Sequence, residues 1–186
     1  MGLNVAIVGL SRSTHDDAPW SDPTWEKWGL PWDDGYWLWC NRLFEMHALE
    51  LIESVPCRKP GYIDLLNSVE VPLYMQDEYK EIQRSKRYPF EDVSKVTGDY
   101  FNSSIAYMLA LAIYEKADKI GLWGVDMAAD EEYFYQRPNI EYLLGLARGK
   151  GIEIYIPEES PILKFHGEGI KFGDSFPTYK GRYGWL

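Results

Sequence analysis

Apolar residues occur along the chain in short continuous runs, separated by segments rich in polar residues, glycine and proline. The first run, Asn4 to Val8, is rich in β-branched residues, which is typical of a strand buried in a parallel sheet. Comparable runs predict further strands at residues 25–30, 42–47, 71–76, 119–126 and 152–156. Residues 77–96 are polar and mixed, and this pattern predicts a loop with one or two helical turns.

Helical patterns lie between these runs. Residues 105–116 are rich in Ala, Leu and Met, which predicts a heavily buried helix with Asn102 or Ser103 as its N-cap. A second helix is predicted from Pro138 to Arg148, because apolar residues recur there at helical spacing and proline is favoured in a first helical turn. A short helix is also expected at residues 62–69.

The alternation of strands and helices predicts a Rossmann-like α/β fold, with a mainly parallel sheet flanked by helices. We expect a nucleotide-binding domain over residues 1–157. Residues 158–186 show little periodicity, and we expect them to form an irregular tail packed on the same domain.

The charge balance narrows the classes of function. Asp and Glu number 29 against 19 Lys and Arg, and the resulting net charge of −10 disfavours general binding to nucleic acid. Two cysteines are too few for a disulfide framework, and no His/Cys cluster has the spacing of a zinc site. The chain has no apolar window of about 18 residues, and its first residues lack the basic region of a signal peptide. We therefore expect a cytoplasmic protein without a membrane span.

Aromatic residues make up 16% of the chain, and six of the 8 tryptophans lie between Trp20 and Trp39. Large aromatic side chains either build core or line ligand sites and contact surfaces. All of these interpretations stay open for this segment. A contact surface of this kind could join copies of the chain into a homo-oligomer.

In an open parallel sheet, ligands bind beyond the carboxyl ends of the strands. Four segments are predicted to converge at that edge: Gly9–Thr14, Glu45–His47, Thr97–Ser104 and Asp126–Arg137. The first contains Gly9, Ser11 and Ser13 directly after a predicted strand, which is where such folds place their first ligand loop. The chain has neither a Walker phosphate loop nor a Gly-x-Gly-x-x-Gly motif, so the common nucleotide signatures are absent.

Three further sets of residues are candidates for ligand binding. Asn102, Ser103 and Ser104 stand at the start of a predicted helix, where hydroxyls, free N–H groups and the helix dipole favour a phosphate or carboxylate. Plain N-capping is the alternative. Asp126 at a strand end suits a ribose or sugar hydroxyl or a hydrated Mg²⁺, although no clear magnesium site is present. Arg137 suits an anion, or else a surface ion pair.

Two histidines are candidates for acid–base chemistry. Glu45 and His47 are two positions apart in a predicted strand and therefore share a face, so Glu45 is placed to orient His47 as a general acid or base. His15 lies in the first loop beside Asp16 and Asp17, where it is a candidate for binding or catalysis. A structural role is the alternative for each histidine.

The segment from Tyr100 to Met127, Tyr-Phe-Asn-Ser-Ser through Gly-Val-Asp-Met, resembles a helix–strand segment of two related groups. These are the bacterial sialyltransferases that use CMP-sialic acid and the MptE-like pterin diphosphokinases. Both have an early strand ending in Gly and small polar residues, as in Val8-Gly-Leu-Ser11. The chain also resembles Rossmann-like bacteriophage proteins, which share its Asp22–Gly29, Phe44–His47 and Gly124–Met127 motifs.

The resemblance implies a Rossmann-like domain with a nucleotide near Gly9, Ser11, Ser103, Ser104 and Asp126. The leading hypothesis is a phage-encoded transferase in the host cytoplasm, which uses a nucleotide or nucleotide-sugar substrate to move a sugar or phosphoryl group. Three alternatives stay open. They are a non-catalytic binder that sequesters a nucleotide or signal molecule, an enzyme acting on nucleoside N-glycosidic bonds, and a virion or assembly protein.

Overall fold

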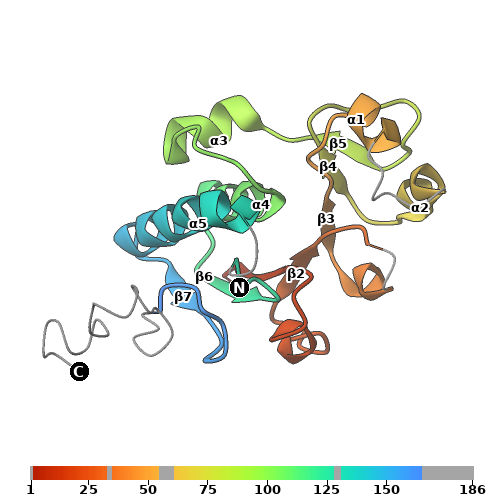
Figure 1. Ribbon diagram of the computed structural model, residues 1–186. Coiled ribbons are helices and arrows are strands. Elements are labelled where there is room, and N and C mark those ends of the chain that lie inside the picture. Colours follow the sequence, from red (N-terminus) through yellow and green to blue (C-terminus); the bar gives the residue numbers. More distant parts are fainter. Residues whose placement is uncertain (1, 33–34, 55–60, 128–130, 165–186) are drawn as a thin grey trace, which may run out of the picture.

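In the computed structural model, which describes residues 2–32, 35–54, 61–127 and 131–164, seven strands form one parallel sheet (Figure 1). Their order is β5-β4-β3-β2-β1-β6-β7. The strands are β1 (Asn4–Val8), β2 (Glu26–Gly29), β3 (Arg42–Phe44), β4 (Leu73–Met75), β5 (Ser85–Arg87), β6 (Lys119–Trp123) and β7 (Glu153–Tyr155). The predicted Rossmann-like α/β fold is confirmed.

One face of the sheet is covered by α3 (Phe90–Thr97), α4 (Ser104–Tyr114) and α5 (Glu131–Gly149), which lie together in Figure 1. Alternate residues of β1, Val5 and Ile7, belong to the same buried cluster as Leu109 of α4 and Leu143 of α5. The apolar run that predicts α4 thus builds the main core, and Ser103 caps this helix as one of the two predicted N-caps.

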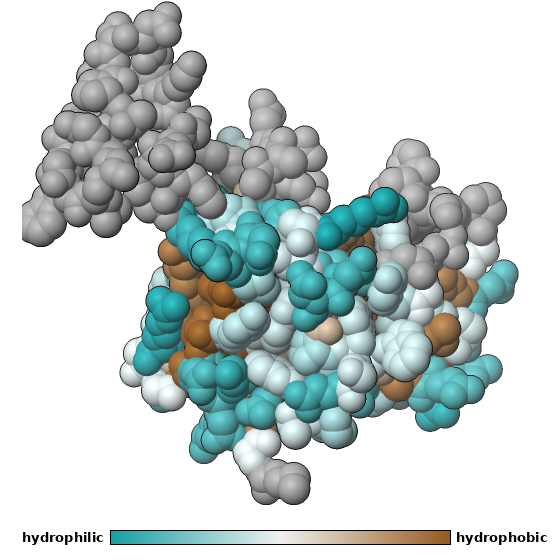
Figure 2. Space-filling view, turned by 90° about the horizontal axis from the view of Figure 1, so that it is seen from below, coloured by the Kyte–Doolittle hydropathy of each residue, from teal (hydrophilic) through white to brown (hydrophobic). Residues whose placement is uncertain are grey.

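The opposite face is covered by a less regular layer. Ala6 and Val8 of β1 pack there against Trp20 and Trp25, in the segment that includes the 3-10 helices η1 (His15–Asp17) and η2 (Tyr36–Trp39). Farther along, α1 (Leu49–Ser54) and α2 (Tyr62–Ser68) cover β3 and β4. Part of the tryptophan-rich segment therefore serves as core. Seen from below, the surface is mostly hydrophilic or intermediate, with apolar residues in small separate groups (Figure 2).

Residues 77–96 contain the predicted helical turns, as all but the last residue of α3, but they also contain the strand β5, where a loop was predicted. Both elements have weak apolar patterns for physical reasons. β5 is an edge strand with Lys86 and Arg87 exposed, and α3 buries only Val93 and Thr97. Edge strands favour charged side chains, so the hydrophobic signal that predicts a buried strand is missing there.

The prediction that Pro138 opens the last helix is wrong, because α5 begins at Glu131 and holds Pro138 in its interior. Proline removes a backbone donor and weakens the hydrogen bonds of the preceding turn. The side-chain amide of Asn102 donates to the carbonyl of Tyr135 in that turn, at 2.6 Å. A contact from another element thus supports a helix that local sequence rules would end.

The first part of the expected tail packs on the domain. Ile162 is fully buried in the main core, and the Ser160 hydroxyl donates to the carbonyl of Val125 at 3.1 Å. Residues 165–186 of that expected tail lie outside the described residues.

None of the helices that the structure describes has the length and apolar character needed to cross a membrane.

Candidate functional site

The strand order changes direction at β1, which lies between β2 and β6. In open parallel sheets such a switch point opens a crevice beyond the carboxyl ends of the strands. Gly9 and Gly124 follow β1 and β6 and approach so closely that a Cβ on Gly9 would lie 2.4 Å from the Gly124 carbonyl oxygen. Gly124 also has a φ of +62°, so both positions require glycine.

The loops after β1 and β6 are joined by hydrogen bonds. The backbone N–H of Ser11 donates to the Gly124 carbonyl at 2.9 Å, and the N–H of Gly124 donates to the buried Thr14 hydroxyl at 2.8 Å. The role of Thr14 was not apparent from sequence, because its partner lies 110 residues away.

Three predicted site residues meet at this switch point. The hydroxyls of Ser11 and Ser13 both donate to the Asp126 carboxylate, Ser13 at 2.7 Å. A carboxylate with hydroxyl partners accepts further hydroxyl donors but repels phosphate. The arrangement therefore suits the hydroxyls of a ribose or sugar better than a phosphate at this point.

The predicted anion cradle at α4 has side chains with structural partners. Ser103 accepts a hydrogen bond from the Ala106 N–H at 3.2 Å as the N-cap, Ser104 begins the helix, and the amide of Asn102 supports α5. A ligand role for these three residues stays a prediction.

Arg137 does not precede a helix as expected, because it lies inside α5. Its guanidinium forms an ion pair with Glu141 at 2.9 Å and donates to the Pro161 carbonyl at 2.8 Å. These contacts match the predicted alternative of an ion pair.

Glu45 and His47 form the predicted pair, but through a different local structure. β3 ends at Phe44, so the expectation that both residues share the face of a strand is wrong. Instead the chain turns, and the buried Glu45 carboxylate accepts from the His47 backbone N–H at 3.1 Å and contacts His47 Nδ1 at 2.5 Å. The hydroxyl of Tyr62, which sequence analysis did not single out, donates to the other carboxylate oxygen at 2.5 Å.

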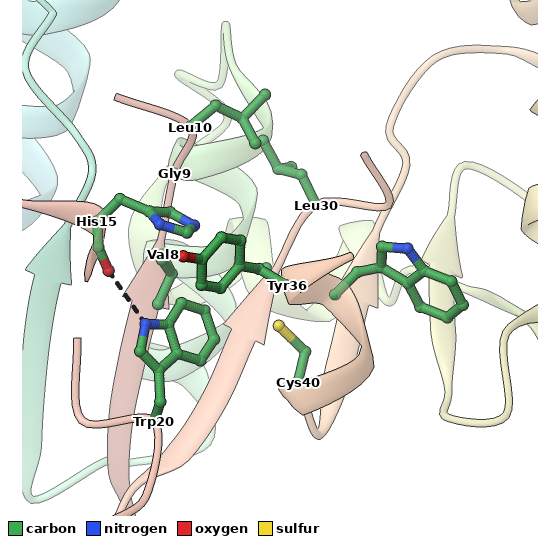
Figure 3. Close-up of a pocket in the computed structure, with 10 residues that line it drawn as sticks. Val8, Gly9, Leu10, His15, Trp20, Leu30, Tyr36 and Cys40 are labelled. Atoms are coloured by element: carbon green, nitrogen blue, oxygen red, sulfur yellow. Dashed lines mark hydrogen bonds between the residues drawn. The ribbon is translucent and has the colours of Figure 1, made fainter. Parts of the chain in front are cut away.

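His15 forms a second histidine–carboxylate pair, with Asp16. Figure 3 shows the side chain of His15 close to those of Tyr36 and Trp20. The His15 ring is buried, 4.3 Å from the ring of Tyr36 and 5.3 Å from that of Trp20. Asp16 is hydrogen-bonded to His15 Nδ1 and to the Tyr36 hydroxyl, each at 3.1 Å. These bonds, first from His15 and then from Tyr36, lower the pKa of Asp16 below its ordinary value.

A cavity of about 340 Å³ opens beside this pair. It is lined by Leu10, Arg12, His15, Asp16, Trp32 and Tyr36. Of these residues only His15 was singled out as a candidate, although Leu10 and Arg12 lie in the predicted ligand loop Gly9–Thr14. The density of tryptophan in this segment was the available signal, and it could not distinguish a pocket from core.

Among the described residues, no group of three or more His, Cys, Asp or Glu is placed to hold a metal ion.

The chain matches no protein-family model, and no curated protein is significantly similar to it. Similar solved structures include the sialyltransferase CstII from Campylobacter jejuni. Its complex with CMP has a TM-score of 0.51 at 18% identity, covering 86% of this chain and 81% of that chain. Its complex with CMP-3FNeuAc has a TM-score of 0.55 at 16% identity, covering 87% and 81%. At such identities the likeness shows a shared fold and nothing beyond it.

Proposed function

We propose that this protein is a nucleotide-sugar-dependent glycosyltransferase. The observation that carries the proposal is the meeting of Ser11, Ser13 and Asp126 at the switch point between β1 and β6. In this proposal the ribose hydroxyls of the nucleotide bind Asp126, and the serine hydroxyls turn toward the ligand. Gly9 and the start of α4, with Ser103 and Ser104, border the same edge of the sheet.

The fold and the sequence resemblance support a nucleotide sugar as the substrate. The CstII structures named above hold CMP or CMP-3FNeuAc, and the resemblance to sialyltransferases covers the segment that ends in Asp126. The resemblance to MptE-like proteins also favours a nucleotide ligand. The resemblance to bacteriophage proteins adds to the proposal that the enzyme acts in the cytoplasm of an infected bacterium.

His47 is the proposed general base, and Glu45 positions it. β3 lies two strand spacings from β1, or roughly 10 Å, which a nucleotide sugar held at Asp126 can span. In the proposed step an acceptor hydroxyl gives its proton to His47, and its oxygen forms a bond to the anomeric carbon. The nucleoside phosphate leaves with the electron pair of the broken carbon–oxygen bond.

The test is a binding screen of nucleotides and nucleotide sugars, CMP and CMP-sialic acid among them, by thermal shift. A ligand at 100 times its Kd should stabilise the fold by roughly 2.7 kcal/mol. Asp126→Asn should weaken the binding of that ligand about tenfold or more, as expected for hydrogen bonds to a charged group. Glu81→Gln is the matched control. Glu81 is exposed and lies just before β5, the edge strand at the end of the sheet away from β6, so this variant should bind the ligand like the parent.

If no nucleotide or nucleotide sugar shifts the melting temperature, the proposal is wrong. If a nucleotide sugar binds through Asp126 but is never turned over with any acceptor, the protein is a sequestering binder instead.

A further inference from the structure

Three large apolar side chains gather around the cavity beside His15. Leu10 is 40% exposed, Trp32 38% and Tyr36 37%, and all three line it. Exposed apolar residues on a soluble protein are usually scattered singly, and a group around one hollow marks an interaction site. The cavity volume of about 340 Å³ is at the lower end for small-molecule sites, enough for one substituted ring.

This cavity is separate from the Ser–Asp cluster at the switch point. Along the loop after β1, Leu10 and Arg12 line the cavity, whereas Ser11 and Ser13 between and after them bond to Asp126. The loop therefore presents Leu10 and Arg12 to the cavity and the two serines to Asp126. A ligand in the cavity lies over the ends of β1 and β2, on the side of η1 and η2.

The polar groups of the cavity have opposite charges at different positions. Arg12 is exposed, and within the described part of the chain it has no hydrogen-bond or ion-pair partner. Along with the hydrogen bonds from His15 and Tyr36, its charge contributes to the lowered pKa of Asp16, so the guanidinium and that carboxylate face the same cavity within electrostatic range. Asp16, in contrast, is fixed by His15 and Tyr36 and can accept further hydrogen bonds from hydroxyl groups.

We propose that this cavity binds an anionic monosaccharide. The ring lies against Trp32 and Tyr36, a hydroxyl donates to Asp16, and a carboxylate or phosphate binds the guanidinium of Arg12, which suits either group. The proposal goes beyond the proposed function, because it assigns a second ligand to a site that does not include Asp126 or His47. His15 positions Asp16 and Tyr36 and does not itself touch the sugar.

Calorimetric titration of the full chain tests the proposal with four probes: glucose 1-phosphate, glucuronate, glucose and inorganic phosphate. At least one of the two anionic sugars should bind more tightly than both glucose and phosphate by about tenfold, the effect of adding a hydrogen bond to a charged group. The tighter of the two shows whether the site takes a phosphate or a carboxylate. If neither anionic sugar binds more tightly than both glucose and phosphate, the proposal is overturned.

Arg12→Gln should weaken the anionic sugar about tenfold or more, and Trp32→Ala should weaken it severalfold. Arg148→Gln removes an exposed arginine at the far end of α5 and should bind like the parent. Trp32→Phe keeps a ring and should retain most of the affinity, which covers the case that the alanine variant folds poorly. Parent-like binding by Arg12→Gln overturns the proposal.

Competition with CMP separates this proposal from the proposed function. Asp126→Asn should lose CMP and keep the anionic sugar, whereas Arg12→Gln should lose mainly the sugar. If CMP displaces the sugar from the cavity, the second site does not exist, and the cavity belongs to the nucleotide. If CMP does not bind but the sugar does, the proposed function fails alone.

Discussion

The two histidine–carboxylate pairs are built in opposite ways. In the pair after β3 the carboxylate is buried and the ring is open, with the Glu45 side chain 3% exposed and that of His47 50%. In the pair after β1 the ring is buried and the carboxylate is open, with His15 8% exposed and Asp16 78%. The contact between ring and carboxylate is 2.5 Å in the first pair and 3.1 Å in the second.

This difference indicates which histidine is available to a substrate. A buried carboxylate needs hydrogen bonds to offset its lost hydration, and Glu45 receives them from His47 and Tyr62. The imidazole that it orients faces outward. The ring of His15 is enclosed by Tyr36 and Trp20, so it serves as a support while its carboxylate partner faces the cavity.

The largest expected contrast is in turnover. His47→Gln keeps much of the shape but cannot shuttle a proton, so it should lower kcat by about 10²–10⁴ and leave nucleotide binding intact. His15→Gln can still donate to Asp16, and its effect on kcat should be far smaller. Steady-state kinetics with the nucleotide sugar found by the binding screen measures both variants. Equal losses in the two variants would remove the distinction between the pairs.

The next contrast is in stability. Glu45→Ala leaves the His47 N–H without its buried acceptor and the Tyr62 hydroxyl with the Pro31 carbonyl, at 3.0 Å, in place of a carboxylate. This should cost about 1–3 kcal/mol of unfolding free energy. Asp16→Ala should cost much less, because water can replace the exposed carboxylate. Urea denaturation of both variants and the parent gives the two values. A larger loss of unfolding free energy in Asp16→Ala than in Glu45→Ala would contradict the conclusion that Glu45 is the buried carboxylate of the two.

A smaller contrast concerns the tyrosines that donate to the two carboxylates. Tyr62→Phe removes a donor to buried Glu45 and should cost about 1.5 kcal/mol, whereas Tyr36→Phe removes a donor to an exposed carboxylate and should cost less. Both variants keep the aromatic ring, so each is a control for the packing of the other. Thermal unfolding at one pH is sufficient to rank them.

The smallest effect is a pH dependence at the exposed carboxylate. The pKa of Asp16 is lowered in the folded state by hydrogen bonds from His15 and Tyr36, so its ionised form stabilises the fold. This contribution is present above the ordinary pKa of about 4 and is lost as the pH falls through the lowered pKa. The unfolding free energies of the parent and Asp16→Asn should therefore differ at pH 6 and converge near pH 2. A difference that stays constant over this range would exclude the linkage.

The buried parts of the fold could be predicted from sequence, because their signals are local. The β-branched run of β1 and the Ala- and Leu-rich α4 are apolar enough to predict their own structure. β5 and the first turns of α5 depend on other elements. β5 lies at the edge of the described sheet and pairs with β4, and α5 continues through Pro138 with support from Asn102. No short window of sequence contains those contacts.

The candidate site was predictable only where topology decides it. Ser11 and Asp126 are 115 residues apart, and their meeting follows from the rule that strand ends converge at one edge of a parallel sheet. No comparable rule predicts the cavity at Arg12, Trp32 and Tyr36 from the sequence. It depends on irregular 3-10 segments, whose side-chain directions follow no fixed period.

The position of β1 between β2 and β6 has a consequence for folding during synthesis. Asn4 at the start of β1 pairs with Lys119 of β6, so β1 leaves the ribosome long before this second neighbour has been made. Pairings between distant segments form slowly, because a long loop must close before any contact compensates for it. Asp126, which follows β6, therefore reaches Ser11 late. A nascent chain that ends before β6 holds the two serines of the switch-point cluster without Asp126, and one edge of its β1 is not yet paired with β6.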